Sequence, residues 1–385
     1  MPTVLYIGQN PATGTGSPVI VLRHLRRFAA DGWAVAVVAE YGGDYRECQS
    51  EGWSVHRLCH RRWWWPPYRQ HHSSLRWLRL RLLAHQTAAV RPAPDFILSY
   101  LAAHSDFSAQ LAAHVAQITG VPLHMLVHDD ATAFPFARGR EAELHRLHKN
   151  ILRSADTCWF VSPELADCYP STAPRRRILY PIPEGWAQPA SWREEYSRRA
   201  RLFYAGRIWP EQLPLLARVA EVARGCDGEL VLMTEQSVAL RAFCETERLT
   251  WRAPFSGNRE ALAHLAAEAS GVLVSYADTV AAMPWCATSF PSKLVEYCHL
   301  GIPIAITAPA DSAVARWAQR LRFPYFFEPT DVASLRDWFT GLRQRHLWEQ
   351  RAALSLHLAH TEFDPAHIQA ELANAITPGT ECRAA

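Results

Sequence analysis

Two cations and one carboxylate in the second half of the chain have types and spacing suited to an anionic ligand. Arg207 follows Gly206 directly after an apolar run, and a guanidinium there could hold a phosphate through two parallel hydrogen bonds. Lys293 opens a helix-like stretch with Pro and Ser in its first turn, so its ammonium and the positive end of the helix dipole would face one anion. Glu296 lies one turn further along the same side. The competing interpretations are a surface ion pair for Arg207 and an ordinary helix pair of Lys293 with Glu296.

Lysine is rare in this chain. Of the 40 basic residues only Lys149 and Lys293 are lysines, which favours a chemical role for Lys293. Another glycine-containing turn, Gly14-Thr15-Gly16-Ser17, follows the first apolar run and opens a helix, so its backbone N–H groups could approach an anion or a sugar. A turn that simply needs glycine explains this short motif equally well.

A segment rich in arginine and tryptophan has the composition of a membrane-surface contact. Trp63, Trp64 and Trp65 are flanked by arginines, and the stretch from Leu75 to Leu83 alternates leucine with arginines that include Arg76 and Arg79. Aromatic rings suit the headgroup level of a bilayer, and guanidinium groups suit its phosphates. The segment predicts contact with an anionic membrane or a lipid carrier, and a loop followed by a core-facing helix is the alternative.

The elements that would position these residues alternate between strand and helix. Apolar runs predict strands at residues 4–7, 35–38, 96–98, 123–127, 157–161, 202–205, 230–233, 272–275 and 304–307, with helix-like stretches between them. This alternation predicts an α/β protein with two Rossmann-like domains of parallel strands, whose ligands bind at the carboxyl ends of the strands. From residue 331 to residue 376 the pattern becomes helical.

We expect four parts along the chain. They are an N-terminal Rossmann-like domain at 1–180, a Pro-rich linker at 181–200, a second Rossmann-like domain at 201–360 and a helical extension at 361–385. The first domain would take the acceptor side of the cleft between the domains, and the second would take the donor side.

Composition limits the possible partners and the compartment. With 49% hydrophobic and 20% charged residues among 385, the chain has a soluble globular composition, and a formal net charge of +3 argues against a nucleic-acid binder. Nine cysteines form no CxxC pair and no metal-like group with histidine, which indicates a reduced cytosol and no metal site. Because no apolar run approaches the ~20 residues of a membrane span, we expect a cytoplasmic protein that is at most peripheral on the inner face of the membrane.

Several of these motifs together resemble the GT-B glycosyltransferases. They are Gly206-Arg207 after a strand, Phe290-Pro291-Ser292-Lys293-Leu294-Val295-Glu296-Tyr297 followed by Leu300-Gly301-Ile302-Pro303-Ile304, and Ala155-Asp156-Thr157 with Val161-Ser162-Pro163-Glu164-Leu165. The resemblance covers nearly the whole chain. It is closest to the family-4-like group and to related glucuronosyltransferase-type enzymes of exopolysaccharide assembly.

The resemblance implies a nucleoside diphosphate sugar as co-substrate, with no metal and no other cofactor. Glu296 would bind the ribose hydroxyls, and Arg207 and Lys293 would neutralise the diphosphate. Together with Gly16 of the first glycine turn, the expected donor site comprises Gly206, Arg207, Ser289, Phe290, Pro291, Ser292, Lys293 and Glu296. Two positions depart from the family-4 pattern, because Thr288 stands where a second Glu is usual and Gln212 stands near a usual Lys. These departures leave the retaining or inverting outcome open.

The loop after the strand at 123–127 resembles the His-Asp or Asp-Asp loop of these relatives. It contains His128, Asp129 and Asp130, and a side chain there could remove the proton of an acceptor hydroxyl. Asp130 is the first candidate for this base, with Asp129 and His128 as alternatives. Asp130 could instead cap the following turn, since Asp is a favoured capping residue.

The activity expected from these features is metal-independent transfer of a sugar from a nucleoside diphosphate donor to a hydroxyl of a glycan or lipid-linked acceptor. A nucleotide-sugar epimerase or hydrolase of the same fold would use similar donor contacts without an acceptor. A non-catalytic glycan-binding protein is a third possibility, which Thr288 and Gln212 would suit and which Lys293 and Glu296 argue against.

Overall fold

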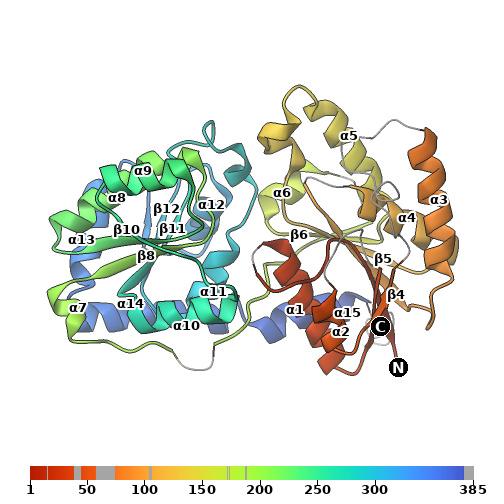
Figure 1. Ribbon diagram of the computed structural model, residues 1–385, viewed down its shortest axis with the longest axis horizontal. Helices are drawn as coiled ribbons and strands as arrows, with labels where there is room; N and C mark the ends of the chain where they lie inside the picture. Colours follow the sequence, from red (N-terminus) through yellow and green to blue (C-terminus); the bar gives the residue numbers. More distant parts are fainter. Residues whose placement is uncertain are drawn as a thin grey trace, which may run out of the picture. The chain divides into compact units, whose positions relative to one another are not determined.

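The structure of the chain is a computed structural model that describes residues 1–14, 16–38, 45–57, 74–103, 106–170, 172, 174–186 and 189–376. The chain forms two compact units, and Figure 1 shows the elements of each. One unit comprises Met1–Pro181 together with Ala366–Ala385, and the other comprises Ile182–Pro365. Trp63, Trp64 and Trp65 lie outside the described residues.

The first unit is built on a seven-stranded parallel sheet with the strand order β3-β2-β1-β4-β5-β6-β7. Its strands are β1 (Thr3–Ile7), β2 (Ala34–Val38), β3 (Ser54–His56), β4 (Phe96–Leu101), β5 (Leu123–Val127), β6 (Thr157–Phe160) and β7 (Arg175–Ile178). β1, β4 and β5 are buried along their whole length, which their continuous apolar sequences allow in a sheet covered by helices.

Helices connect these strands. They are α1 (Ser17–Ala30), α2 (Arg46–Ser50), α3 (Ser74–Ala88), α4 (Phe107–Thr119), α5 (Glu141–Leu152) and α6 (Pro163–Cys168), with short 3₁₀ turns η3 (Ala131–Ala133) and η4 (Pro135–Ala137) after β5. α1 starts with Pro18 in its first turn, a position that tolerates proline because its N–H would have no helical partner.

The last helix, α15 (Pro365–Ile376), returns to the first unit and packs beside α1. The Nδ1 atom of His24 in α1 lies 2.8 Å from Oε1 of Gln369 in α15, and both side chains are buried. The helical end of the chain, predicted as a separate extension, is therefore part of the N-terminal unit.

The second unit has a six-stranded parallel sheet with the order β10-β9-β8-β11-β12-β13. Its strands are β8 (Arg201–Ala205), β9 (Glu229–Met233), β10 (Thr250–Arg252), β11 (Gly271–Ser275), β12 (Ile304–Thr307) and β13 (Phe326–Phe327). Its helices are α7 (Glu195–Arg198), α8 (Leu213–Gly225), α9 (Val238–Thr246), α10 (Asn258–Glu268), α11 (Ser292–Leu300), α12 (Ala313–Arg320), α13 (Val332–Gly341) and α14 (Arg345–His360), with 3₁₀ turns η5 (Pro210–Gln212) and η6 (Pro284–Ala287).

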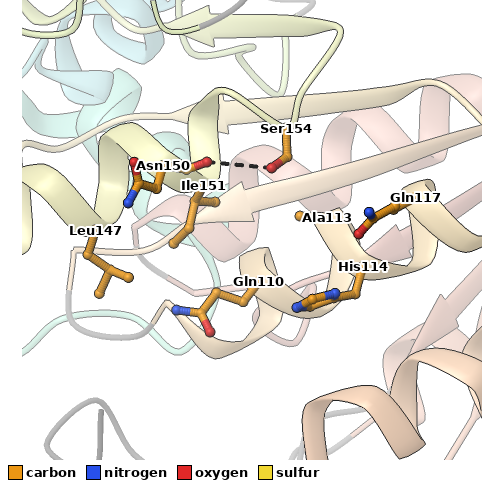
Figure 2. A pocket seen from close by; sticks show the side chains of 8 residues that line it. All are labelled: Gln110, Ala113, His114, Gln117, Leu147, Asn150, Ile151 and Ser154. Atoms are coloured by element: carbon orange, nitrogen blue, oxygen red, sulfur yellow. Dashed lines mark hydrogen bonds between the residues drawn. The ribbon is translucent and has the colours of Figure 1, made fainter. Parts of the chain in front are cut away.

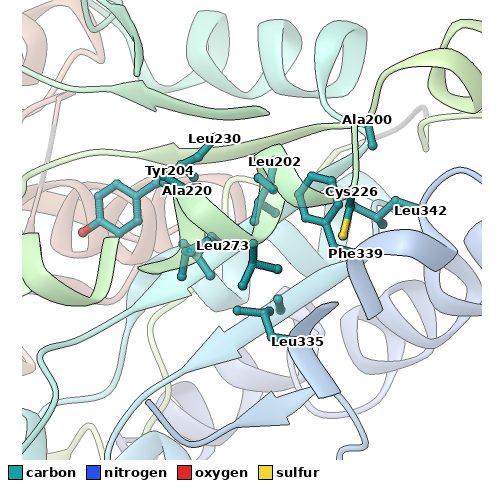
Figure 3. Close-up of a cluster of buried hydrophobic side chains, with 14 of the residues drawn as sticks. Ala200, Leu202, Tyr204, Ala220, Cys226, Leu230, Leu273, Leu335, Phe339 and Leu342 are labelled. Carbon is teal, nitrogen blue, oxygen red and sulfur yellow. The ribbon is translucent and has the colours of Figure 1, made fainter. Parts of the chain in front are cut away.

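One core of the second unit lies where α8 and α13 cover the sheet (Figure 3). Leu202 and Leu273 of the sheet pack there with Ala220 of α8 and Phe339 of α13. Tyr196, which falls within the predicted linker 181–200, is buried in the same cluster. From Ile182 onward the predicted linker thus belongs to the second unit. The two parallel sheets with their helices confirm the predicted α/β class.

Candidate functional site

Lys293 lies at the carboxyl end of β8, against the backbone of Gly206. Its Nζ donates a hydrogen bond of 2.9 Å to the hydroxyl of Tyr204 and lies 4.1 Å from the centre of that ring. A Cβ atom on Gly206 would come within 2.7 Å of Lys293 Cε, and Gly206 has a φ of 105°. Gly206 is therefore required twice, for its backbone conformation and for the space that the lysine occupies.

The hydroxyl of Tyr204 connects the ammonium of Lys293 with the backbone of Arg207. It donates to the backbone oxygen of Arg207 at 2.8 Å and accepts from Lys293 and from Nε2 of Gln212, the latter at 3.2 Å. Tyr204 was not among the predicted site residues. A tyrosine within an apolar strand, two residues before Gly206, was the signal that could have identified it.

Gln212 is buried and uses both ends of its amide. Its Nε2 donates to the backbone oxygen of Ser275 at 2.6 Å, and its Oε1 accepts from the backbone N–H of Trp209 at 2.9 Å. Ser275 ends β11, the neighbour of β8 in the sheet, so Gln212 connects the carboxyl ends of two adjacent strands. Gln212, which departs from the family-4 sequence pattern, is thus a fixed part of this site.

The side chain of Arg207 is exposed and stacks on an aromatic ring. Its Cζ lies 4.1 Å from the ring centre of Trp209, whose ring in turn lies 4.9 Å from that of Trp285. Among the described residues Arg207 forms no ion pair with a carboxylate, so the alternative of a surface ion pair is not realised there.

Glu296 lies in α11 with its carboxylate nearly buried. Its Oε2 accepts from the backbone N–H of Glu184, and its Oε1 accepts from Nδ2 of Asn258, both at 3.4 Å. Both bonds are long, and both donors come from segments far from α11 in the sequence. Asn258, at the start of α10, is a second residue that sequence reasoning missed.

The residues that lead into α11 are mainly structural. Phe290 is buried against Trp317 and Phe363, with ring centres 5.8 and 6.0 Å apart. Ser289 accepts a hydrogen bond from the hydroxyl of Tyr276 through its backbone oxygen at 3.3 Å. Pro291 is the N-cap of α11, and Ser292 is its first residue. These contacts fix the N-terminus of α11.

In the first unit Asp130 caps the turn η3. Its Oδ1 accepts from the N–H of Thr132 and from the hydroxyl of Tyr169, each at 3.0 Å, and its Oδ2 accepts from the hydroxyl of Thr132 at 2.8 Å. The capping interpretation therefore describes Asp130. The neighbouring Asp129 is half-exposed.

His128 is buried between Ser17 and Tyr100. Its Nδ1 lies 3.3 Å from the Ser17 hydroxyl, which lies 2.6 Å from the Tyr100 hydroxyl. Burial, with a smaller contribution from His24, lowers the pKa of His128 to about 3. Burial, with a smaller contribution from Asp129, raises the pKa of Tyr100. His128 is therefore a neutral imidazole at neutral pH.

The glycine turn before α1 is explained by backbone geometry. Gly16 has a φ of 82° and is the N-cap residue of α1, and Gly14 has a φ of 129°. Both values are in the region that favours glycine. Thr15 lies outside the described residues.

Two hollows lie elsewhere on the units. A groove of about 570 Å³ runs between α4 and α5, lined by side chains such as Gln110, His114 and Asn150 (Figure 2). A hollow of about 740 Å³ in the second unit is bordered by the segments after β11, β12 and β13, where Arg218 pairs with Asp278. Neither hollow contains a predicted site residue.

The predicted membrane helix, α3, has a different exposed face from the one expected. Arg76 is buried, with its guanidinium 2.9 Å from the carboxylate of Asp106 and 5.3 Å from the ring centre of Phe107. It therefore does not belong to an exposed cationic face, and Arg79 is half-buried. Trp77 and Leu78 are exposed instead.

Among the described residues, no three His, Cys, Asp or Glu side chains come together as a metal ligand set would. Every helix in the same ranges is too short or too polar to cross a lipid bilayer.

Comparison with known proteins connects the chain to solved structures only. No protein-family model and no curated protein matches it. HepE of Anabaena in complex with UDP and glucose is 12% identical with a TM-score of 0.66, and the match covers 98% of this chain and 99% of HepE. A glycosyltransferase from Rickettsia africae ESF-5 is 9% identical with a TM-score of 0.70 and 97% coverage of both chains. The apo form of WaaB, a lipopolysaccharide outer core galactosyltransferase, is 12% identical with a TM-score of 0.61, covering 97% of this chain and 99% of WaaB.

These likenesses show that the chain has the GT-B fold, as its motifs predicted.

Proposed function

We propose that the protein transfers a glycosyl group from a nucleoside diphosphate sugar to a hydroxyl group of an acceptor. The observation that carries the proposal is the ammonium of Lys293, fixed against Gly206 at the carboxyl end of β8 and at the start of α11. Parallel α/β sheets bind ligands at this edge, and a helix N-terminus and a lysine both favour a phosphate. Solved neighbours of this fold with bound UDP and UDP-glucose support the donor class.

The second unit would stabilise the nucleoside diphosphate as it leaves the sugar. When the bond between the anomeric carbon and the diphosphate oxygen breaks, its electron pair stays on the diphosphate. Lys293, Arg207 and the first N–H groups of α11 would hold this growing negative charge. Glu296 would accept hydrogen bonds from hydroxyls of the donor. We propose that these side chains serve without a divalent metal ion.

The first unit would supply the group that accepts the proton of the acceptor hydroxyl. Of the three predicted candidates we favour Asp129, because it is half-exposed, whereas Asp130 and His128 are buried. An aspartate within reach of the acceptor takes the proton as the new glycosidic bond forms.

The direct test is release of nucleoside diphosphate from a panel of UDP-, GDP- and ADP-sugars, with and without glycan acceptors, in buffer containing EDTA. We expect acceptor-dependent release from one donor class. Release at the same rate without acceptor would indicate a hydrolase, and interconversion of the sugar would indicate an epimerase. Binding of a donor without any turnover would indicate a glycan-binding protein, and a requirement for Mg²⁺ or Mn²⁺ would contradict metal independence.

We also propose that the exposed face of α3 docks on an anionic membrane, where a lipid-linked acceptor would be found. Trp77, Leu78 and Leu82 are 55%, 49% and 46% exposed, and they lie within six residues of one helix. Arg81 lies on the same face with its Cζ 4.8 Å from the ring centre of Trp77. Clustered large apolar side chains mark interaction surfaces, and a ring beside a guanidinium suits the headgroup level of a bilayer.

Charge favours an anionic surface as the partner. Residues 52–94 contain eight arginines and no aspartate or glutamate, whereas the rest of the chain has 32 basic and 37 acidic residues. Each basic residue near an anionic membrane contributes about 1 kcal/mol, so this segment can bind reversibly although the whole chain is nearly neutral. Membrane contact by Trp63, Trp64 and Trp65 stays a prediction, because these residues lie outside the described ranges.

Co-sedimentation with vesicles tests this docking surface. The protein should pellet with phosphatidylglycerol-containing vesicles, weakly with phosphatidylcholine alone, and less in high salt. A triple variant with Ser at 77, 78 and 82 should lose the binding. A control with Ser at the exposed positions Val238, Phe255 and Leu321 of the second unit should keep it. Equal pelleting of both variants would refute the docking surface.

A further inference from the structure

We infer that Tyr204 is the positioning residue of the donor site, because one phenol oxygen holds the ammonium of Lys293 and the backbone of Arg207 together. This inference rests on the proposed function and extends it. The sequence pointed to the two cationic residues, but the oxygen that connects the Lys293 ammonium with the Arg207 backbone became visible only in the structure.

The bonding capacity of the phenol oxygen is fully used. A tyrosine hydroxyl donates one hydrogen bond and accepts two. Its proton goes to the backbone oxygen of Arg207, at 2.8 Å, so its two lone pairs receive Gln212 Nε2 and Lys293 Nζ. The direction of every bond in the group is therefore determined. Among the described residues the Lys293 ammonium has no other hydrogen-bond partner, so its remaining N–H groups are available to an anion.

Tyr204 itself has little freedom to move. Its ring is 2% exposed and belongs to the core cluster under α8. Gln212 is held on the Ser275 oxygen and the Trp209 N–H, so it cannot turn away from the phenol. The rigid strand and the buried amide thus keep the flexible lysine side chain in one place, which spares a ligand the cost of ordering it.

The side chain of Gln212 is uncharged, and this matters for the position of Lys293. A second ammonium at this position would compete for the phenol oxygen and repel Lys293 in a partly buried site. With an amide there, Lys293 can approach the oxygen to 2.9 Å. The glutamine is therefore not a lost cation but the partner that allows one lysine to be held firmly.

The first test needs no ligand and uses the scarcity of lysine. With ¹⁵N-lysine label the protein gives two Nζ signals, because Lys149 and Lys293 are its only lysines. In the wild type the Lys293 ammonium protons should exchange with water more slowly than those of Lys149. Tyr204→Phe should remove this difference. Tyr297→Phe is the matched control, since the Tyr297 hydroxyl donates to the Ala205 oxygen at 3.2 Å and, among the described residues, forms no hydrogen bond with Lys293.

The second test measures binding of UDP and of uridine by calorimetry. Tyr204→Phe should weaken UDP binding roughly 10-fold, the effect of losing one hydrogen bond to a charged group, and leave uridine binding unchanged. Tyr297→Phe should leave the ratio of the two affinities at its wild-type value. A variant that merely loosens the fold would weaken both ligands.

The outcomes separate the two proposals. If the wild type binds none of UDP, ADP and GDP, the proposed function fails, while the lysine spectra still decide whether Tyr204 holds Lys293. If UDP binds but Tyr204→Phe leaves both the spectra and the UDP affinity unchanged, the positioning role of Tyr204 is refuted and the proposed function stands.

Discussion

Gly206→Ala tests how much the donor site depends on the space above one glycine. The added Cβ would lie 2.7 Å from Lys293 Cε and 3.0 Å from its Nζ, so the end of the lysine must move. The move breaks its 2.9 Å hydrogen bond to Tyr204, an interaction of a charged group typically worth about 1.5–3 kcal/mol. We therefore expect UDP affinity to fall roughly 10-fold to 100-fold.

Backbone strain adds a separate effect on folding. Gly206 has a φ of 105°, and an alanine held there costs of order 1–3 kcal/mol of stability. Gly225→Ala is the control, because Gly225 ends α8 with a negative φ and nothing within 4 Å of its added Cβ. This control should be as stable as the wild type or slightly more so.

A double-mutant cycle separates the two effects of Gly206→Ala on the ligand. In a Lys293→Ala background, the substitution should no longer change UDP affinity, although its cost in melting temperature should remain. UDP binding by calorimetry and unfolding by scanning calorimetry give the two quantities. A folded Gly206→Ala protein that binds UDP within twofold of the wild type would refute the assignment of Lys293 to the donor site.

Three further outcomes follow from the first unit. Asp129→Asn should slow glycosyl transfer about 10²-fold to 10⁴-fold and leave UDP binding unchanged. Asp130→Asn should mainly lower the melting temperature, because it weakens the cap of η3. Equal activity of Asp129→Asn and the wild type would exclude Asp129 as the base. Burial lowers the pKa values of His24 and His124 to about 4 and of His128 to about 3, so between these values and 6.5 the unfolded chain binds protons that the folded unit does not. The stability of this unit should then fall as the pH falls below 6.5, by up to about 1.4 kcal/mol per pH unit for each histidine, and pH-independent unfolding from 7 to 5 would contradict those shifts. In denaturant unfolding, Arg76→Met should destabilise this unit by about 3–5 kcal/mol because it removes the cationic partner of the buried Asp106, and exposed Arg81→Met should cost less than about 1 kcal/mol.

The sheets show which parts of the fold the sequence could predict. All nine predicted strands are present, and each is an apolar run in the interior of a sheet. The four strands that the sequence did not predict are β3, β7, β10 and β13, the outermost strands of the two sheets. An edge strand has a neighbour on one side only, so it needs no continuous apolar run and often has charged residues that prevent further pairing. β7, with the sequence Arg175-Arg176-Arg177-Ile178, is such a strand.

The donor site was predictable in its residue types but not in its hydrogen bonds. Gly206 and Lys293 could be identified because a glycine after a strand and a rare lysine at a helix start each have a local signature. The bond between Lys293 and Tyr204 joins residues 89 positions apart, and that between Gln212 and Ser275 joins residues 63 apart. No periodicity or composition gives the direction of a side chain across two neighbouring strands.

The helix α3 shows why residue type alone misplaces a surface. Its sequence contains three arginines, and their chemistry suits a bilayer and a protein interior alike. The position of Asp106 bears on this choice, because a carboxylate with 0% side-chain exposure needs a cationic partner, and Arg76 forms an ion pair with it. The pairing and the burial of apolar side chains require the same rotation of α3 about its axis. Leu80 and Leu83 then turn into the core with Arg76, and Trp77 and Leu78 turn outward with Arg81. The buried ion pair and the exposed apolar and cationic face thus lie on different sides of one helix.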